Sequence, residues 1–218
     1  MMKKNGFTLA EVLITLAIIG VVATLTLPSL MTNTGEQQAM TAYKKVMNTL
    51  NEAGQMNAAL EGFDYSGVTT TSAGNKTDKI SSGAQTLTAL FNERLQVSEA
   101  ASVPFASTSD HCKDAPVLVL RDGMALCLGD AKYDTTGGFW TTWVDTNGAK
   151  GPNKEATCGD EGCNTKASRH IFDQFPVTLY KGVAIPGHWS AVEVEATGNS
   201  DKAARYAMGI GKRTSTGS

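Results

Sequence analysis

The chain has 218 residues, a formal net charge of −2, and 41% hydrophobic residues. This length fits one compact domain with an appendage, the lack of a basic excess gives no indication of nucleic-acid binding, and the hydrophobic content is too high for a disordered chain. The apolar residues are concentrated near the N-terminus, whereas the remainder is polar and rich in Gly and Thr. This distribution argues against an ordinary cytosolic enzyme.

The first predicted element is a helix over the 24 residues from Phe7 to Leu30, whose only charged residue is Glu11. A helix of this length rises about 36 Å, which is enough to cross a hydrocarbon core of about 30 Å. Lys3 and Lys4 precede the stretch, and no Lys or Arg follows it closely. The positive-inside rule therefore predicts a single-pass inner-membrane protein with its N-terminus in the cytoplasm and its remainder outside.

A secretory signal peptide and a plain membrane anchor are two alternatives for this stretch. It is long for a signal peptide, and no A-x-A pattern follows it. A carboxylate near the membrane end of an anchor costs about 2–3 kcal/mol unless it reaches water, so a plain anchor gains nothing from Glu11. Cleavage after Gly6 would create a positively charged partner for Glu11, the new α-amine of Phe7.

The segment KKNGFTLAEVL at residues 3–13 resembles the prepilin leader of type IV pilins and type II secretion pseudopilins. The shared features are a short basic leader, a Gly before the cut, a Phe after it and a Glu shortly beyond. The resemblance implies that a prepilin peptidase cuts between Gly6 and Phe7 and that the Phe7 nitrogen is then methylated. Methylation keeps the charge of the amine, so Glu11 and the Phe7 amine of neighbouring copies are the expected assembly residues.

The resemblance also implies an α+β, pilin-like fold, in which a long N-terminal α-helix packs on a small antiparallel β-sheet head. We expect a leader peptide at 1–6, a long helix at 7–60 with a membrane-spanning and filament-core part at 7–30, and a disulfide-containing head at 61–218. Pro28 marks either the end of the anchor or a point where the helix loosens on packing.

From Glu36 onward the pattern becomes amphipathic, with apolar residues recurring at spacings of three and four up to a stop near Gly62. This spacing predicts a helix with one apolar face. Lys44, Lys45, Asn48, Asn51 and Glu52 lie off that face. The predicted face comprises Ala39, Tyr43, Val46, Leu50, Ala53 and Leu60, with Met47 beside it.

The head pattern predicts a short helix at 82–97 followed by strands. Two apolar runs, at 117–121 and 124–128, flank Asp122-Gly123, which is a strong hairpin signal. Further strands are predicted at 139–144, 175–180 and 189–196, whereas residues 198–218 show no clear pattern.

Four cysteines lie in the part of the chain predicted to be outside the cytoplasm, which favours disulfides. Three pairings are combinatorially open. Cys158 and Cys163 enclose a short loop whose ends can meet, and Cys127 lies on the second strand of the hairpin that Cys112 precedes. We therefore expect Cys112–Cys127 and Cys158–Cys163. A zinc site would add His111 or His170 to the thiols, but the spacing is not a standard zinc pattern.

The segment WVDTNGAKGPN at 143–153 is rich in turn-forming residues. Asp145 and Asn147 either form an Asx turn that braces the sheet edge or bind Ca²⁺, because they have the spacing of the first half of an EF-hand loop. Ala156 occupies the position where that loop would carry a Glu. The segment is similar to one in several pseudopilin-like proteins, some of whose relatives bind calcium in this part of the head. No other cofactor is predicted.

No catalytic motif surrounds the three His residues, so we predict a structural protein and not an enzyme. The main hypothesis is the subunit of a type IV pilus-like filament. The alternatives are a pseudopilin of a type II secretion or DNA-uptake system, a minor pilin, or a surface enzyme or receptor with an ordinary anchor. Expected partners are copies of itself or related pilins, a prepilin peptidase and an inner-membrane assembly platform; the expected final location is a cell-surface filament or a periplasmic pseudopilus. Glu11 favours a position inside the polymer, since a tip subunit has no copy above it.

Overall fold

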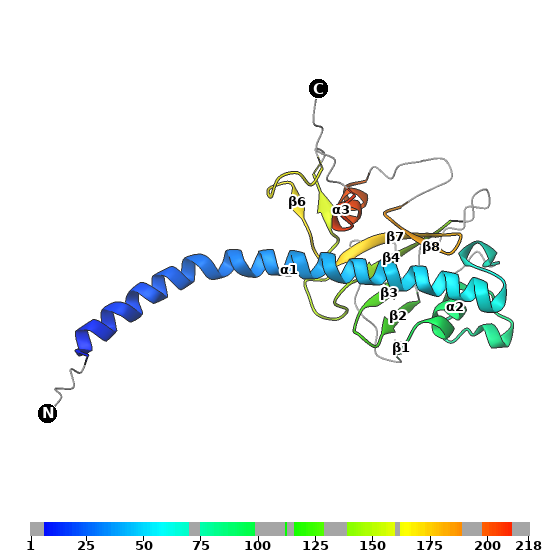
Figure 1. The fold of residues 1–218 in the computed structure, drawn as a ribbon, viewed down its shortest axis with the longest axis horizontal. Coiled ribbons are helices and arrows are strands. Elements are labelled where there is room, and N and C mark those ends of the chain that lie inside the picture. Colours follow the sequence, from blue (N-terminus) through cyan, green and yellow to red (C-terminus); the bar gives the residue numbers. More distant parts are fainter. Residues whose placement is uncertain are drawn as a thin grey trace, which may run out of the picture. The chain divides into compact units, whose positions relative to one another are not determined.

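The computed structural model describes residues 7–69, 75–98, 112, 116–128, 139–159, 162–188 and 198–210, with only the backbone at 28–33. They form an α+β fold with a long N-terminal helix, α1 (Leu9–Glu61), and an antiparallel six-stranded sheet (Figure 1). The chain divides into two compact units, residues 1–38 and 39–218, and each is described by itself.

The first unit contains the N-terminal part of α1, whose described side chains up to Leu27 are almost all exposed. Leu9–Leu27 is long and apolar enough to cross a membrane. The hydroxyls of Thr15 and Thr24 donate to backbone carbonyls one turn earlier, at 2.9 and 2.8 Å, so these polar groups are satisfied within the helix. The helix continues without a break through Pro28, so this residue does not end it.

In the second unit, α1 buries one face against the sheet, as its amphipathic pattern predicts. One predicted member is wrong: Leu60 is 64% exposed. Asn57 is fully buried in its place; its Nδ2 donates to the Phe63 carbonyl at 2.8 Å and its Oδ1 accepts from Arg94 Nε at 2.9 Å. The buried members of the face are Tyr43, Val46, Met47, Leu50 and Ala53.

The main sheet has the strand order β1-β2-β3-β4-β7-β8, and every neighbouring pair is antiparallel. The hairpin around Asp122-Gly123 is confirmed, with Gly123 at φ 90° in its turn, and the strands predicted at 139–144 and 175–180 are confirmed to within one residue. The strands are β1 (Val97–Ser98), β2 (Val117–Leu120), β3 (Ala125–Cys127), β4 (Trp140–Asp145), β7 (Gln174–Tyr180) and β8 (Val183–Pro186), and a separate pair is formed by β5 (Thr157–Cys158) and β6 (Arg169–His170).

Four short helical segments complete the head: η1 (Tyr65–Gly67), η2 (Ile80–Ser82), α2 (Leu87–Arg94) and α3 (Asn199–Ala207). The helix predicted at 82–97 is shorter in the structure, because Thr86 caps α2 by accepting from the Ala89 N–H at 3.0 Å. Both α3 and β8 were missed by the sequence prediction, and the strand predicted at 189–196 lies outside the described residues.

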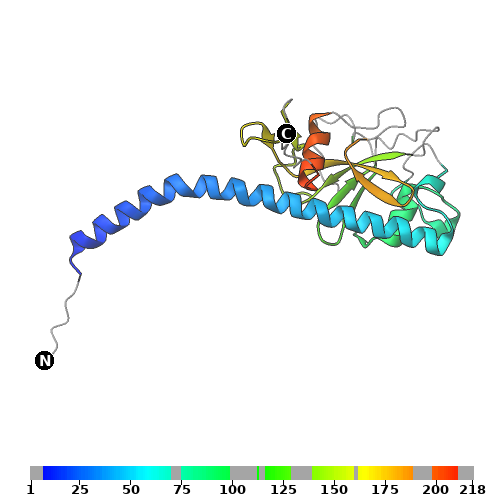
Figure 2. The same cartoon turned by 45° about the horizontal axis from the view of Figure 1, so that its top comes forward.

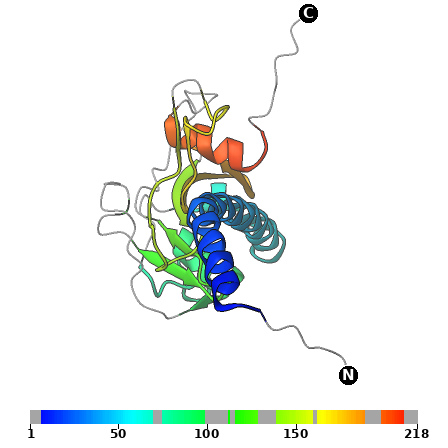
Figure 3. The ribbon, with the colours of Figure 1, turned by 90° about the vertical axis from the view of Figure 1, so that its left-hand side faces the viewer.

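The helices of the head lie at different places around the sheet. Near the C-terminal end of α1 lies α2 (Figure 2). The views in Figures 1 and 3 agree that α3 lies toward the β7–β8 end of the sheet, away from β1. One carboxylate fixes the start of α3: Asp201 accepts from the Gly198 N–H at 3.0 Å and from the His188 N–H at 2.7 Å.

Candidate assembly site and head loops

The N-terminal end of α1 contains a reciprocal pair of hydrogen-bonding residues, Thr8 and Glu11. The Thr8 hydroxyl oxygen accepts from the Glu11 N–H at 3.3 Å. In return, Glu11 Oε2 accepts from both the N–H and the hydroxyl of Thr8, each at 2.8 Å. This arrangement is a capping box, in which two otherwise unpaired backbone donors of a helix start are satisfied by side chains. The sequence reasoning missed it, although the T-x-x-E signal is plain at residues 8–11.

Because of the capping box, Glu11 is not an isolated carboxylate. Its Oε2 atom has two donors, whereas no residue in the described part of the chain donates to Oε1. These hydrogen bonds stabilise the ionised carboxylate and so offset part of the cost of placing a charge at the membrane end of a helix. Phe7 is 88% exposed, and its nitrogen is an amide until the bond to Gly6 is cut. Gly6 itself lies outside the described residues.

The four cysteines form two disulfides in the structure, Cys112–Cys127 and Cys158–Cys163, which are the pairings expected from the sequence. Their Cα–Cα distances are 5.8 and 5.1 Å. Because each of the four sulfurs takes part in one of these two disulfide bonds, none is a thiolate that could bind zinc. In the parts of the chain that the structure describes, no group of three His, Cys, Asp or Glu side chains is placed to hold a metal ion. His111 lies outside those parts.

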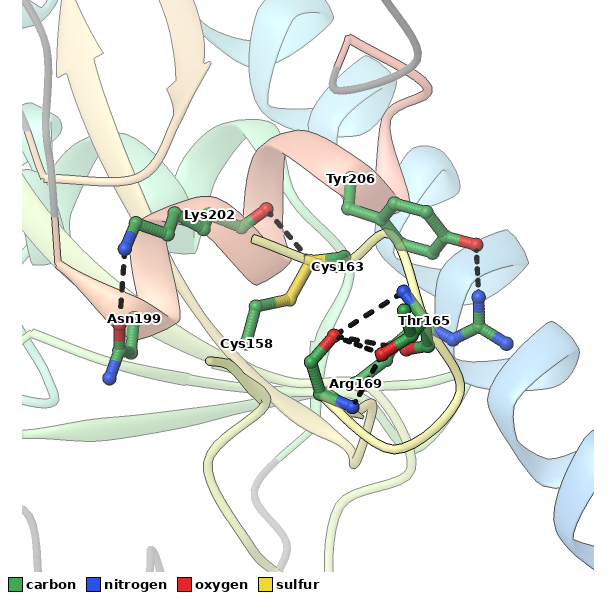
Figure 4. The surroundings of a disulfide bond; sticks show 8 residues. Cys158, Cys163, Thr165, Arg169, Asn199, Lys202 and Tyr206 are labelled. Atoms are coloured by element: carbon green, nitrogen blue, oxygen red, sulfur yellow. Dashed lines mark hydrogen bonds between the residues drawn. A yellow bond between two sulfur atoms is a disulfide. The ribbon is translucent and has the colours of Figure 1, made fainter. Parts of the chain in front are cut away.

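The Cys158–Cys163 disulfide closes the loop that follows β5, and it lies beside α3 (Figure 4). Cys163 Sγ lies 3.6 Å from the Lys202 carbonyl on α3. Arg169 Nη1 donates to the Tyr206 hydroxyl at 2.6 Å, with the guanidinium 5.1 Å from the ring centroid. This cluster therefore holds a short two-stranded hairpin, which has few backbone hydrogen bonds of its own, against a helix.

The loop after β4 is organised by Asp145, which is fully buried. Its Oδ1 accepts from the backbone N–H groups of Asn147 and Gly148 at 3.0 and 2.7 Å, and its Oδ2 accepts from Gln174 Nε2 at 2.9 Å. Burial raises the pKa of the Asp145 carboxyl to about 6, against the lowering effect of these donors. The bond from the Asn147 N–H to Oδ1 of Asp145 forms an Asx turn, which is one of the two arrangements expected for this loop. Each oxygen of Asp145 accepts from at least one N–H group in this arrangement.

Asp173 is a second organiser of this loop that sequence reasoning missed. Its Oδ2 accepts from Asn147 Nδ2 at 3.1 Å and from the Asn153 N–H at 2.8 Å, and its Oδ1 accepts from the Lys154 N–H at 2.7 Å. Asn147 thus contacts Asp173 through its Nδ2, whereas its Oδ1, the atom that a calcium ion would bind, is buried and has no hydrogen-bond partner among the described residues. No local sequence signal links Asp173 to a loop some 20 residues earlier.

Comparison with known families bears on the N-terminus. Residues 1–27 match the family model of the prokaryotic N-terminal methylation motif. The chain carries a prepilin-type leader. This motif is the leader of type IV pilins and pseudopilins. It implies processing by a prepilin peptidase and, in general terms, assembly as a pilin. It also points to a structural protein. With the adjoining apolar helix, the leader fits membrane anchoring of a precursor. Neither a curated protein nor a solved structure matched the chain significantly.

Proposed function

We propose that this prepilin-type protein is the structural subunit of a type IV pilus-like filament. It polymerises through α1 after cleavage between Gly6 and Phe7 and methylation of the Phe7 nitrogen. The observation that carries the proposal is the leader motif running directly into a helix whose apolar side chains are exposed around its circumference from Leu9 to Leu27. So large an apolar surface needs either lipid or other copies of the helix to cover it.

The helix is covered first by lipid and later by other copies of itself. As a precursor, the chain spans the inner membrane once with its head outside the cytoplasm. An assembly platform in that membrane then transfers the helix into a filament at the cell surface or into a pseudopilus in the periplasm. Inside a helical bundle without water, a lone carboxylate is costly and a paired one is tolerable. The Phe7 amine of a neighbouring copy is the partner that an axial offset can bring to Glu11, and this pairing fixes the register.

Substitution of Glu11 tests the pairing. We expect Glu11→Val to insert in the membrane and to be cut after Gly6, because Val increases the apolarity and leaves the cleavage junction intact. As the sole copy it should fail to form filaments. Thr15→Val is the matched control, since it also replaces a polar residue of α1 by Val but removes no charge; it should assemble. Normal filaments from the Glu11→Val strain would refute the charge pair.

Two measurements on native cells test the processing and the type of filament. Mass spectrometry should find a mature chain that begins at N-methylated Phe7; a chain that begins at Met1, Met2 or beyond Leu30 contradicts prepilin processing. Electron microscopy should show long surface filaments that contain this subunit. Short periplasmic filaments, or a subunit present only in trace amounts, would reassign the chain to a pseudopilus or to a minor pilin, which share this leader.

A further inference from the structure

We propose that the head binds a sugar acid in a groove between α1, the C-terminal end of α2 and the turn that joins β2 to β3 (Figure 1). The groove has a volume of about 520 Å³, which is within the usual range for sites that take a small organic molecule. This inference goes beyond the proposed function, because it concerns the head alone and does not depend on assembly.

The first observation is that the groove carries more positive charge than its own carboxylate neutralises. Lys45 Nζ lies 2.8 Å from Asp122 Oδ2, so these two charges compensate each other. Arg121 also lines the groove, and its backbone N–H is fixed by a bond of 3.0 Å to the Gln96 carbonyl. Its exposed guanidinium has no hydrogen-bond or ion-pair partner among the described residues. A cation without a counter-ion therefore remains on the wall of the groove.

Arg94 is a second guanidinium in the lining, and its position is fixed within the head. Its side chain is only 11% exposed. Its Nε donates to Asn57 Oδ1 at 2.9 Å and its Nη2 donates to Glu61, whereas its Nη1 has no acceptor among the described residues. A guanidinium held in this way loses little freedom when it donates to a ligand. The planar donors of Arg94 and Arg121 suit a carboxylate, which accepts hydrogen bonds with both of its oxygens.

The uncharged part of the lining indicates what carries the carboxylate. Leu95 and Leu120 are 8% and 6% exposed and give the groove a small apolar surface. Gln96 adds an exposed amide, which both donates and accepts. The Thr49 hydroxyl donates to the Lys45 carbonyl at 3.0 Å, so its oxygen can still accept from a ligand. A sugar ring presents C–H groups and hydroxyls together, and a carboxylate on that ring completes the match.

Nuclear magnetic resonance titration of the mature chain in a zwitterionic detergent tests the site. The probes are glucuronate, glucose, which lacks the carboxylate, and acetate, which lacks the sugar ring. We expect glucuronate to bind with millimolar affinity and to shift the backbone amides of Gln96 and Arg121, because exposed ion pairs contribute little individually. Glucose and acetate should bind at least about fivefold more weakly. Equal affinity for glucose or for acetate overturns the assignment to a sugar acid, and the absence of shifts with glucuronate overturns the site.

Variants of exposed cations show whether the groove itself attracts the carboxylate. Arg121→Gln removes the uncompensated charge and should weaken glucuronate binding about fivefold. Lys44→Gln is the matched control, because it removes one exposed positive charge from α1 and Lys44 is not part of the groove lining; it should bind like the unmodified chain. Unchanged binding by Arg121→Gln, or an equal loss in both variants, overturns the carboxylate site. Because filaments are not measured, neither result bears on the pairing of Glu11.

Discussion

At the scale of single residues, the buried Asp145 carboxyl has a shifted pKa whose effect on stability can be measured. Its burial raises its pKa to about 6, whereas an exposed Asp in the unfolded chain titrates near 3.8. Gln174, Asn147 and Gly148 donate to the ionised form and lower the pKa, and the nearby Asp173 carboxylate raises it. Since burial is the largest of these effects, the folded state binds the proton more tightly than the unfolded state.

Because the pKa of Asp145 is higher in the folded chain than in the unfolded chain, the free energy of unfolding should depend on pH. Between about pH 4 and pH 6 the folded chain retains a proton on Asp145 that the unfolded chain has released, so this residue stabilises the fold at low pH and the contribution is lost as pH rises through about 6. An Asn at this position keeps an acceptor for the Asx turn and does not titrate. Relative to Asp145→Asn, the unmodified protein should therefore lose about 3 kcal/mol of unfolding free energy from pH 4 to pH 7.

Chemical denaturation at several pH values measures this difference. Glu52→Gln is the control, because Glu52 is an exposed carboxylate outside the loop. Glu52→Gln shows the effect of removing one exposed carboxylate from the same chain. A difference between the unmodified protein and Asp145→Asn that does not change with pH would show that the buried carboxyl titrates in the folded protein as it does in the unfolded one.

Asn51 provides a second prediction at this scale. Its Oδ1 accepts from the Ala184 N–H on the edge strand β8 at 2.6 Å, so α1 covers a backbone donor that an edge strand would otherwise leave unpaired. Asn51→Ala should destabilise the head by about 1 kcal/mol relative to Asn48→Ala. Asn48 is exposed on the same helix, so the change in helix propensity is matched. Equal unfolding free energies for the two variants in denaturant titrations would contradict this role.

At the scale of elements, strong periodicity was enough to predict α1 and the central strands. The three- and four-residue spacing of Tyr43, Val46 and Leu50 matches the face that packs on the sheet. The pattern failed at Leu60, because the sheet does not extend that far along the helix and Asn57 is held there by Arg94 from α2. Such a polar contact between distant segments has no periodic signal.

The missed elements are those whose buried residues are small or few. The buried apolar side chains of α3 are only Ala203, Ala204 and Ala207, so its apolar face consists of small side chains, although this face is well separated from the polar and charged residues of the helix. The edge strand β8 has four residues, of which only Pro186 is buried. Both elements contact β7, and the Asp201 carboxylate of α3 accepts from the N–H of His188, which follows β8. Neither contact can be predicted from the local sequence.

The two disulfides give a prediction for the elements they join. On a loop-entropy estimate, the Cys158–Cys163 bond stabilises by about 2 kcal/mol and the longer Cys112–Cys127 loop by about 3 kcal/mol. Paired Cys→Ser variants should lose stability in that order, as measured by thermal unfolding. Non-reducing peptide mapping of the unmodified protein should recover peptides linked through 112–127 and 158–163. Cross-linked peptides with any other pairing would contradict the arrangement of the hairpin and the β5–β6 pair.

At the scale of the whole molecule, the chain combines a unit whose apolar side chains are exposed with a unit that contains its own core. The sequence predicted both parts, because the apolar run and the amphipathic pattern after it are local signals. Cleavage between Gly6 and Phe7 and the assembly role of Glu11 remain predictions. The sequence reasoning missed the capping role of Thr8 at the start of α1 and the contacts of Asp173 with the loop after β4. Both roles depend on which donors lie near a given carboxylate oxygen in the folded chain. Among the residues whose side chains the structure describes, none before Ala39 belongs to the hydrophobic core cluster or packs against it.

This distribution predicts that a fragment beginning at Ala39 folds by itself. It retains Tyr43, whose hydroxyl donates to the Pro176 carbonyl at 2.8 Å and whose ring stacks on Phe175 at 4.5 Å between centroids. Exported to an oxidising compartment, the fragment should be soluble and monomeric in sedimentation experiments and unfold in one cooperative transition. The mature chain should need detergent, because its exposed apolar helix remains.

A shorter fragment beginning at Ala53 is the control for this prediction. It keeps every strand and both disulfides but loses Tyr43, Val46, Met47 and Leu50, four of the buried side chains that cover the sheet. Removing a large buried side chain typically costs 2–5 kcal/mol, so losing four exceeds the roughly 5–15 kcal/mol stability of an ordinary domain or comes close to it. Cooperative unfolding of the longer fragment only would place the boundary of independent folding between residues 39 and 53. Cooperative unfolding of both would mean that the head is stable without residues 39–52 of α1. Aggregation of both would mean that the head depends on residues before Ala39.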